Sequence, residues 1–64
     1  MSPRQVLAIR ETLELTQQEL AQLIGCQRHT VARWETGVSE PRGANLKALR
    51  ELAEKAKRRQ KKGR

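Results

Sequence analysis

The sequence predicts an all-α fold, a compact bundle of four short helices, and three observations carry this prediction. Apolar residues recur at intervals of three and four, as they do along one face of a helix. Glycine and proline occur only near expected helix ends, in loops or in the tail. No stretch alternates apolar and polar residues in the way a half-buried strand does. At 64 residues there is room for one domain, which we place at residues 1–54, followed by a basic tail at 55–64.

Two capping boxes predict where the first two helices begin. A capping box pairs serine or threonine at the N-cap with glutamate or glutamine three residues later. The first is Ser2-Pro3-Arg4-Gln5, with proline at the first helical position, and the second is Thr16-Gln17-Gln18-Glu19. Gly25 is expected to end the second helix. The apolar stripes are Val6, Ile9 and Leu13 in the first helix, which also carries Arg10, and Leu20, Leu23 and Ile24 in the second.

The positions of glycines and the spacing of leucines predict the third and fourth helices. The third is expected from about Arg28 to Thr36, with Gln27 as its cap and Gly37 as its stop. Residues 38–43 form a loop, and the fourth helix is expected from about Ala44 to Ala56. Its apolar stripe consists of Leu46, Leu49, Leu52 and Ala53.

The net charge of +7 is confined to the tail. Residues 1–54 carry seven basic side chains and seven glutamates, which cancel. The tail has one apolar residue, so it cannot bury a face, and we expect it to be the end of the last helix or disordered. It offers polyanions an electrostatic arm, although a basic terminus that only aids solubility is an alternative. The charged residues of the tail are Lys55, Lys57, Arg58, Arg59, Lys61, Lys62 and Arg64.

Several classes of function are excluded by what the sequence lacks. No run of about 18 apolar residues could span a membrane, and the N-terminus has no signal-peptide core. Cys26 and His29 have no second pair with which to form a metal site or a nucleophilic triad. There is no aspartate and no phosphate-cradling glycine loop. We therefore expect a cytoplasmic protein, nucleoid-associated in a bacterial host, with no catalysis, no cofactor, no metal and no small-molecule ligand.

The segment from Thr16 to Thr36 reads as a helix, the three-residue turn GCQ, and a second helix. A short turn containing glycine makes the two helices cross steeply, which leaves the second one protruding. At 100° per residue, Val31 and Trp34 lie on the side expected to face the core. The opposite side contains no acid, and its members are Arg28, His29, Ala32, Arg33 and Thr36.

The stretch VLAIRETLELTQQELAQLIGCQRHTVARWETGVSEP resembles the helix-turn-helix family of phage repressors and Cro proteins. The shared pattern is an arginine late in the first helix, then TQ..LA...G, then TV.RWE.G, then a proline and a leucine-rich helix. The resemblance covers residues 4–53 and implies a lambda-repressor-like fold that binds double-stranded DNA sequence-specifically. It further implies a small bacterial or phage repressor, often autoregulatory, that occupies an inverted-repeat operator.

The resemblance also implies which side chains touch DNA. Base edges in the major groove would be read at the start of the third helix and one turn later, by Gln27, Arg28, His29, Ala32 and Arg33. Phosphates would be contacted by Gln17, Thr36, Arg42 and the backbone near Gly43. Arginine donates a bidentate pair to guanine, so Arg28 and Arg33 favour sites containing G. Glu40 stands where relatives frequently carry a basic residue, which weakens the loop as a phosphate clamp.

Arg10 and Glu35 resemble a family pair that joins the first and third helices. An arginine on an apolar stripe needs such a partner, because an unpaired buried charge is costly. We therefore expect a structural ion pair. Two-fold operators also require a homodimer, at least on DNA. The basic tail would repel itself across a two-fold axis, so we expect a monomer or weak dimer in solution, paired on DNA through residues 38–45 or the fourth helix.

Two other functions remain open from the sequence. One is an antitoxin-type module whose main partner is a protein, and Leu7, which lies off the apolar stripe, could mark that contact. The other is RNA or nonspecific nucleic-acid binding driven by the tail, with the folded body as a platform. Removing residues 55–64 would separate these cases, because a specific DNA binder keeps its sequence preference without the tail.

Overall fold

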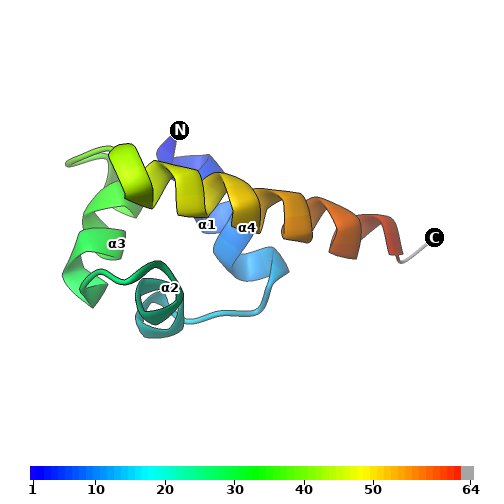
Figure 1. The fold of residues 1–64 in the computed structure, drawn as a ribbon. Helices are drawn as coiled ribbons and strands as arrows, with labels where there is room; N and C mark the ends of the chain where they lie inside the picture. Colours follow the sequence, from blue (N-terminus) through cyan, green and yellow to red (C-terminus); the bar gives the residue numbers. More distant parts are fainter. Residues whose placement is uncertain (63–64) are drawn as a thin grey trace.

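The computed structural model describes residues 1–62 as four α-helices (Figure 1). Their bounds are α1 Pro3–Thr12, α2 Gln17–Ile24, α3 Arg28–Thr36 and α4 Gly43–Lys62. No strand occurs among these residues, so the predicted all-α class is confirmed. In Figure 1, α3 lies beside the start of α4, and the last turns of α4 project beyond the other helices at the opposite end.

Both predicted capping boxes are present. The Oγ of Ser2 accepts a hydrogen bond from the backbone N–H of Gln5 at 3.2 Å. In turn, the side-chain Oε1 of Gln5 accepts a hydrogen bond from the backbone N–H of Ser2 at 2.8 Å. Thr16 and Glu19 form the same reciprocal pair at 3.0 and 2.8 Å. These bonds satisfy N–H groups that have no partner within the helix, and they fix where α1 and α2 begin.

The helix α3 has the predicted bounds, but its first turn lacks the side-chain capping bonds that begin α1 and α2. Gln27 occupies the N-cap position, as predicted, but its side chain makes no capping hydrogen bond. Glutamine is one methylene longer than the preferred cap asparagine and does not fold back readily onto its own backbone. The backbone instead closes the first turn, because the carbonyl of Gln27 accepts the Thr30 N–H at 3.0 Å.

The helix α4 is longer than predicted and ends at Lys62 instead of near Ala56. Lysine, arginine, glutamine and alanine are good helix formers, and cations near a helix C-terminus interact favourably with its dipole. Arg59 also forms an ion pair of 3.4 Å with Glu14, in the turn between α1 and α2. The basic segment therefore continues the helix through residue 62, and Arg64 lies outside the described residues.

The core is a single apolar cluster contributed by all four helices. Val31 and Trp34 of α3 are buried in it, as the helical wheel predicts. The other buried members are Val6, Ile9, Leu20, Ala21 and Leu49. Leu23, predicted to share the α2 stripe, is 61% exposed. The prediction is wrong because Leu23 lies about 160° around the helix from the buried Ala21.

Replacing Gly25 by alanine should lower the free energy of unfolding by about 1–2 kcal/mol. Gly25 ends α2 with φ at +95°, a conformation that L side chains rarely adopt, although a Cβ there would meet nothing within 4 Å. The expected loss of stability thus comes from the strained backbone conformation and not from a steric clash of the new side chain. Urea unfolding followed by circular dichroism measures it, with Gln22→Ala on the exposed face of α2 as the control. Equal stability of the two variants would contradict the explanation.

Candidate nucleic-acid interface

The outer face of α3 is a free, basic helical surface. Arg28, His29 and Arg33 are exposed, whereas Val31 and Trp34 on the opposite face are buried against the other helices. Within the described part of the chain, the three exposed side chains make no hydrogen bond or ion pair. Their donors are therefore available to a ligand.

The neighbouring positions complete this surface. Gln27, at the N-terminus of α3, is exposed, and Ala32 is half-buried between the arginines. Thr36 is exposed in the last turn of α3, where its hydroxyl donates to the carbonyl of Arg33 at 3.2 Å. The residues predicted to read bases thus lie on one helix, on the side that faces away from the core.

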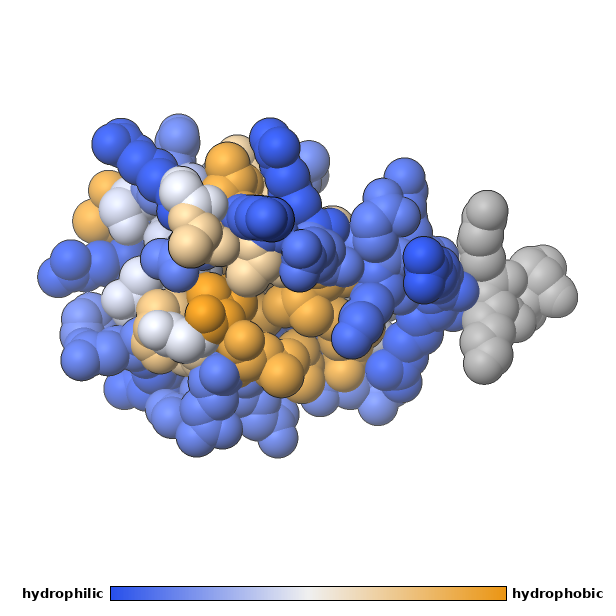
Figure 2. Space-filling view, in the orientation of Figure 1, coloured by the Kyte–Doolittle hydropathy of each residue, from blue (hydrophilic) through white to orange (hydrophobic). Residues whose placement is uncertain are grey.

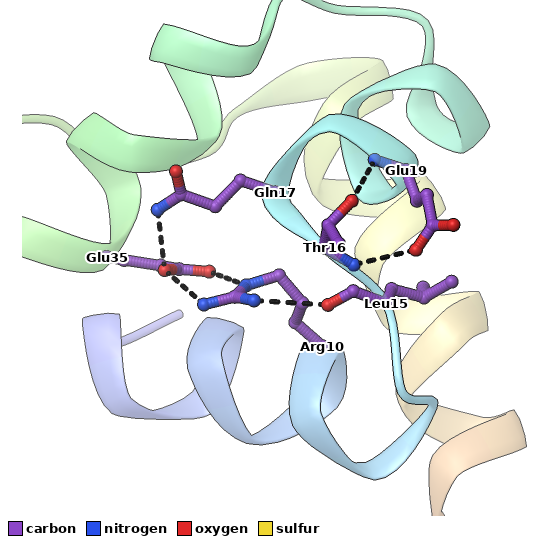
Figure 3. Close-up of polar contacts among 6 residues, drawn as sticks. All are labelled: Arg10, Leu15, Thr16, Gln17, Glu19 and Glu35. Atoms are coloured by element: carbon purple, nitrogen blue, oxygen red, sulfur yellow. Dashed lines mark hydrogen bonds and ion pairs between the residues drawn. The ribbon is translucent and has the colours of Figure 1, made fainter.

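An ion pair joins α1 to α3 behind this surface (Figure 3). Arg10 donates from Nε to Oε2 of Glu35 at 2.6 Å and from Nη2 to Oε1 at 3.0 Å. Its third nitrogen, Nη1, donates to the carbonyl oxygen of Leu15 at 3.1 Å. The Arg10 and Glu35 side chains are only 19% and 8% exposed. This bidentate geometry fixes both the distance and the rotation of α3 relative to α1.

Gln17 extends the ion pair to α2. Its Nε2 donates to Oε1 of Glu35 at 3.1 Å, so one carboxylate oxygen accepts from both Arg10 and Gln17 (Figure 3). One amide hydrogen of Gln17 and the free N–H groups at the start of α2 remain for an outside acceptor. No sequence spacing signals the contact between Gln17 and Glu35, because only the crossing of α2 and α3 brings these residues together.

The pKa of Glu35 reports the strength of this network. Burial alone would raise the pKa of that carboxyl, but the hydrogen bonds from Arg10 and Gln17 and the charge of Arg10 lower it below its ordinary value. The hydrogen bond to Glu35 likewise raises the pKa of Arg10. Both groups are therefore charged at neutral pH, and the pair is an ionic one.

Acid should remove the stability that this network contributes. Because the pKa of Glu35 is lowered on folding, its contribution is present above the ordinary value of 4.5 and is lost as the pH falls through the lowered value. We expect the urea midpoint of the wild-type chain to fall between pH 7 and about pH 3 by more than that of Glu35→Gln. Parallel decreases in the two proteins would show that Glu35 is not responsible.

The residues predicted to contact phosphates lie at the starts of two helices next to α3. Gln17 is at the N-terminus of α2, beside Glu35 of α3, whereas Arg42 and Gly43 are exposed at the start of α4. The carbonyl of Arg42 accepts the N–H of Asn45 at 3.1 Å, so Arg42 begins the first turn of α4. Each helix start thus combines a polar side chain with N–H groups that have no partner within the helix, which suit an anionic oxygen.

The basic residues in the last part of α4 do not join this surface. Lys55, Lys57, Arg58 and Arg59 are exposed on the part of α4 that projects away from α3 (Figure 1). Lys61 and Lys62 continue the helix. The tail residues therefore form a separate surface.

An apolar area lies on another face, below α4 in the middle of Figure 2. A groove between α2 and α4 is lined by Leu23 of α2 and by Ala48, Glu51, Leu52 and Lys55 of α4. Val38, 72% exposed, stands apart from it in the loop after α3. Leu7 is half-buried beside Pro3 and Arg4.

Neither a metal-binding cluster nor a membrane-spanning helix is present in residues 1–62. No group of three or more histidine, cysteine, aspartate or glutamate side chains there could hold a metal ion. None of the helices there is both long and apolar enough to cross a membrane. Cys26 is half-buried against the core, and burial raises the pKa of its thiol, which disfavours the reactive thiolate.

Comparisons with known proteins agree with this geometry. A family model described as helix-turn-helix matches residues 6–55. The type II methyltransferase M.SsoII of Shigella sonnei is 44% identical over 43 residues, which are 62% of this chain and 11% of the methyltransferase. The chain therefore spans about a tenth of that relative's length. No solved structure matches the chain.

Proposed function

The chain belongs to the helix-turn-helix family, and from that premise we propose that it is a sequence-specific transcriptional repressor that occupies an inverted-repeat operator in double-stranded DNA. DNA binding of the transcription-regulator type follows from the family itself. The observation that supports sequence reading is the outer face of α3, where Arg28, His29 and Arg33 are exposed and have no hydrogen-bond or ion-pair partner among the described residues. In this proposal α3 lies in the major groove.

Base recognition would come from the first two turns of α3. Arg28 and Arg33 are one turn or more apart on the outer face, and each can donate two hydrogen bonds to O6 and N7 of a guanine. Ala32 has too short a side chain to hold α3 away from the groove, and its methyl group suits a thymine methyl. His29 and Gln27 supply further donors and acceptors at the same edge.

Phosphate contacts would fix the register of α3 in the groove. We assign them to Gln17 at the start of α2, to Thr36 in the last turn of α3, and to Arg42 and the Gly43 backbone at the start of α4. The bond from Gln17 to Glu35 holds the Gln17 amide next to α3, so a phosphate contact there would also orient the recognition helix. Such contacts position a protein on DNA but carry no sequence information.

Repression would require two chains on one operator. Half-sites one helical turn apart place two recognition helices about 34 Å apart. We propose pairing through residues 38–45 and the outer side of α4, and the exposed Val38 supports this surface. The proposed repressor would block transcription by occupancy, often of its own operon, in the cytoplasm of a bacterial host and associated with its nucleoid.

Selection from random duplex DNA at physiological salt tests the proposal. An inverted repeat with half-sites that contain G would support a dimeric operator-binding repressor. Recovery of no motif, with affinity that collapses as salt rises, would reject sequence-specific binding. Sedimentation with and without the selected duplex then measures whether two chains assemble on it.

A protein partner is the second candidate function, and the exposed Leu23 with the groove beside it favours this alternative. An antitoxin-type module would use such an apolar area to hold its partner. Co-expression with the products of adjacent genes tests this function. Co-purification of one product that Leu23→Gln abolishes would support it, whereas no complex, or a complex that Leu23→Gln leaves intact, would reject this surface.

A further inference from the structure

The positive charge of the chain is separated from its recognition helix. We use the name cationic arm for Lys55, Lys57, Arg58 and Arg59, the four described basic residues at the projecting end of α4. Residues 1–54 have no net charge, because their seven basic residues and seven glutamates cancel. The excess charge is therefore carried by the arm and by the residues that follow it.

The distance between the arm and α3 follows from helix geometry. The end of α3, Thr36, precedes the start of α4, Gly43, by a short loop, so the two helix ends are neighbours. Lys57 lies fourteen residues further along α4, which is about 21 Å at 1.5 Å per residue. Figure 1 shows the same separation, with α3 beside the start of α4 and the arm at the other end. The molecule is 35 Å long in its longest dimension.

Salt screening prevents the arm from assisting α3 through its electric field. The Debye length is about 8 Å at physiological ionic strength, so 21 Å is more than two screening lengths. The arm can therefore strengthen the binding of DNA only by contacting the DNA itself. Glu40, which weakens the loop as a phosphate clamp, lies at the α3 end of the molecule, so the arm does not act at that clamp.

The arm is presented in a fixed direction. Its backbone is helical, and Ala56 within it is buried against the body. Arg59 is tied to Glu14 at 3.4 Å, whereas Lys57 and Arg58 are exposed and make no hydrogen bond or ion pair among the described residues. Lys57 borders a groove between α1 and α4, and both cations are carried by a helix that cannot swing freely toward α3.

We propose that the cationic arm is a second DNA-binding surface, which contacts duplex phosphates outside the half-site read by α3. The inference rests on the proposed function. Cations without aromatic neighbours match a phosphate backbone, whereas single-stranded nucleic acid is usually bound by stacking on aromatic side chains. The chain has no phenylalanine or tyrosine, and its one tryptophan is buried. The phosphates belong either to the flanks of the same duplex or to a second duplex.

The test compares two variants that each lose two charges from α4. Lys57→Gln with Arg58→Gln removes two of the four charges of the arm, and Lys47→Gln with Arg50→Gln removes the same charge nearer to α3. Glutamine keeps the helix propensity of these positions. Truncation is less suitable, because removing residues 55–64 would also remove the buried Ala56.

Affinity is measured on a hairpin duplex of about 8 base pairs that holds only the selected half-site, and on the same half-site with flanks of about 12 base pairs. The arm variant should bind the short hairpin within about twofold of wild type. On the flanked duplex it should lose about tenfold, with the salt slope reduced by roughly 1–2. The control variant should show no flank-dependent loss. Capture of a labelled second duplex by an immobilised complex distinguishes a second duplex from flanks.

Two results would overturn the inference. An equal loss on the short hairpin would place the arm at the half-site, and unchanged affinity on every duplex would show that the arm does not bind DNA. If selection yields no half-site, the proposed repressor function fails, but random-sequence duplexes of the same two lengths still test the arm. A length-dependent loss on them would support the arm even then.

Discussion

Replacing Glu35 by alanine should lower the free energy of unfolding by about 2–4 kcal/mol. The change leaves the guanidinium of Arg10, 19% exposed, without a counter-charge, and it removes the acceptor of Gln17. A domain of this size has on the order of 5 kcal/mol to lose. Urea unfolding followed by circular dichroism at pH 7 measures the loss, and the variant should be partly unfolded at 37 °C.

The control for this prediction is removal of both partners. Arg10→Met with Glu35→Leu leaves no unpaired charge, so the double variant should be more stable than either single variant. Additive losses would contradict the explanation, because they would show that the two charges act independently. Gln22→Ala, on the exposed side of α2, should have the stability of the wild type.

Replacing Arg33 by alanine should relax base preference at one position of the half-site and weaken operator binding by about 1–3 kcal/mol, or roughly 5- to 150-fold. Arg33 is exposed, and its side chain makes no hydrogen bond or ion pair within the described residues, so the stability of the fold should be unchanged. Repeating the selection with the variant identifies the position. Fluorescence anisotropy on the selected duplex gives the loss in affinity.

The matched control is Arg50→Ala, which removes an exposed arginine from α4 instead of α3. It should leave base preference unchanged. If Arg33→Ala instead weakened binding equally for every sequence and lowered the salt slope by about one, Arg33 would contact a phosphate and not a base. That outcome would move base reading to the other residues at the start of α3.

Local signals predicted most of the fold. The reciprocal caps at Ser2 and Thr16 and the left-handed glycines at 25 and 37 act within a few residues, so the sequence alone places the ends of α1, α2 and α3. The end of α4 was missed because the spacing of apolar residues predicts only the part of a helix that packs against a core. The last turns of α4 consist mainly of polar and charged residues. Leu23 was missed because an apolar residue at helical spacing can still lie beyond the contact with a neighbouring helix.

The candidate site was predictable where the pattern is regular and not where it depends on packing. The division of α3 into a buried side with Val31 and an exposed side with Arg28 follows from helical periodicity alone. The bond between Gln17 and Glu35 depends on how α2 crosses α3, and no spacing along the chain encodes it. The direction of the cationic arm likewise depends on where α4 packs.

The free outer face of α3 has a consequence for how this protein can change over generations. Arg28, His29 and Arg33 are exposed and hold nothing else in place, whereas Val31, Trp34 and Glu35 on the same helix maintain the fold. Mutation can therefore explore new side chains at the first three positions without weakening the scaffold. A gene copy encoding this chain could diverge toward a different target while its folding remains under unchanged selection.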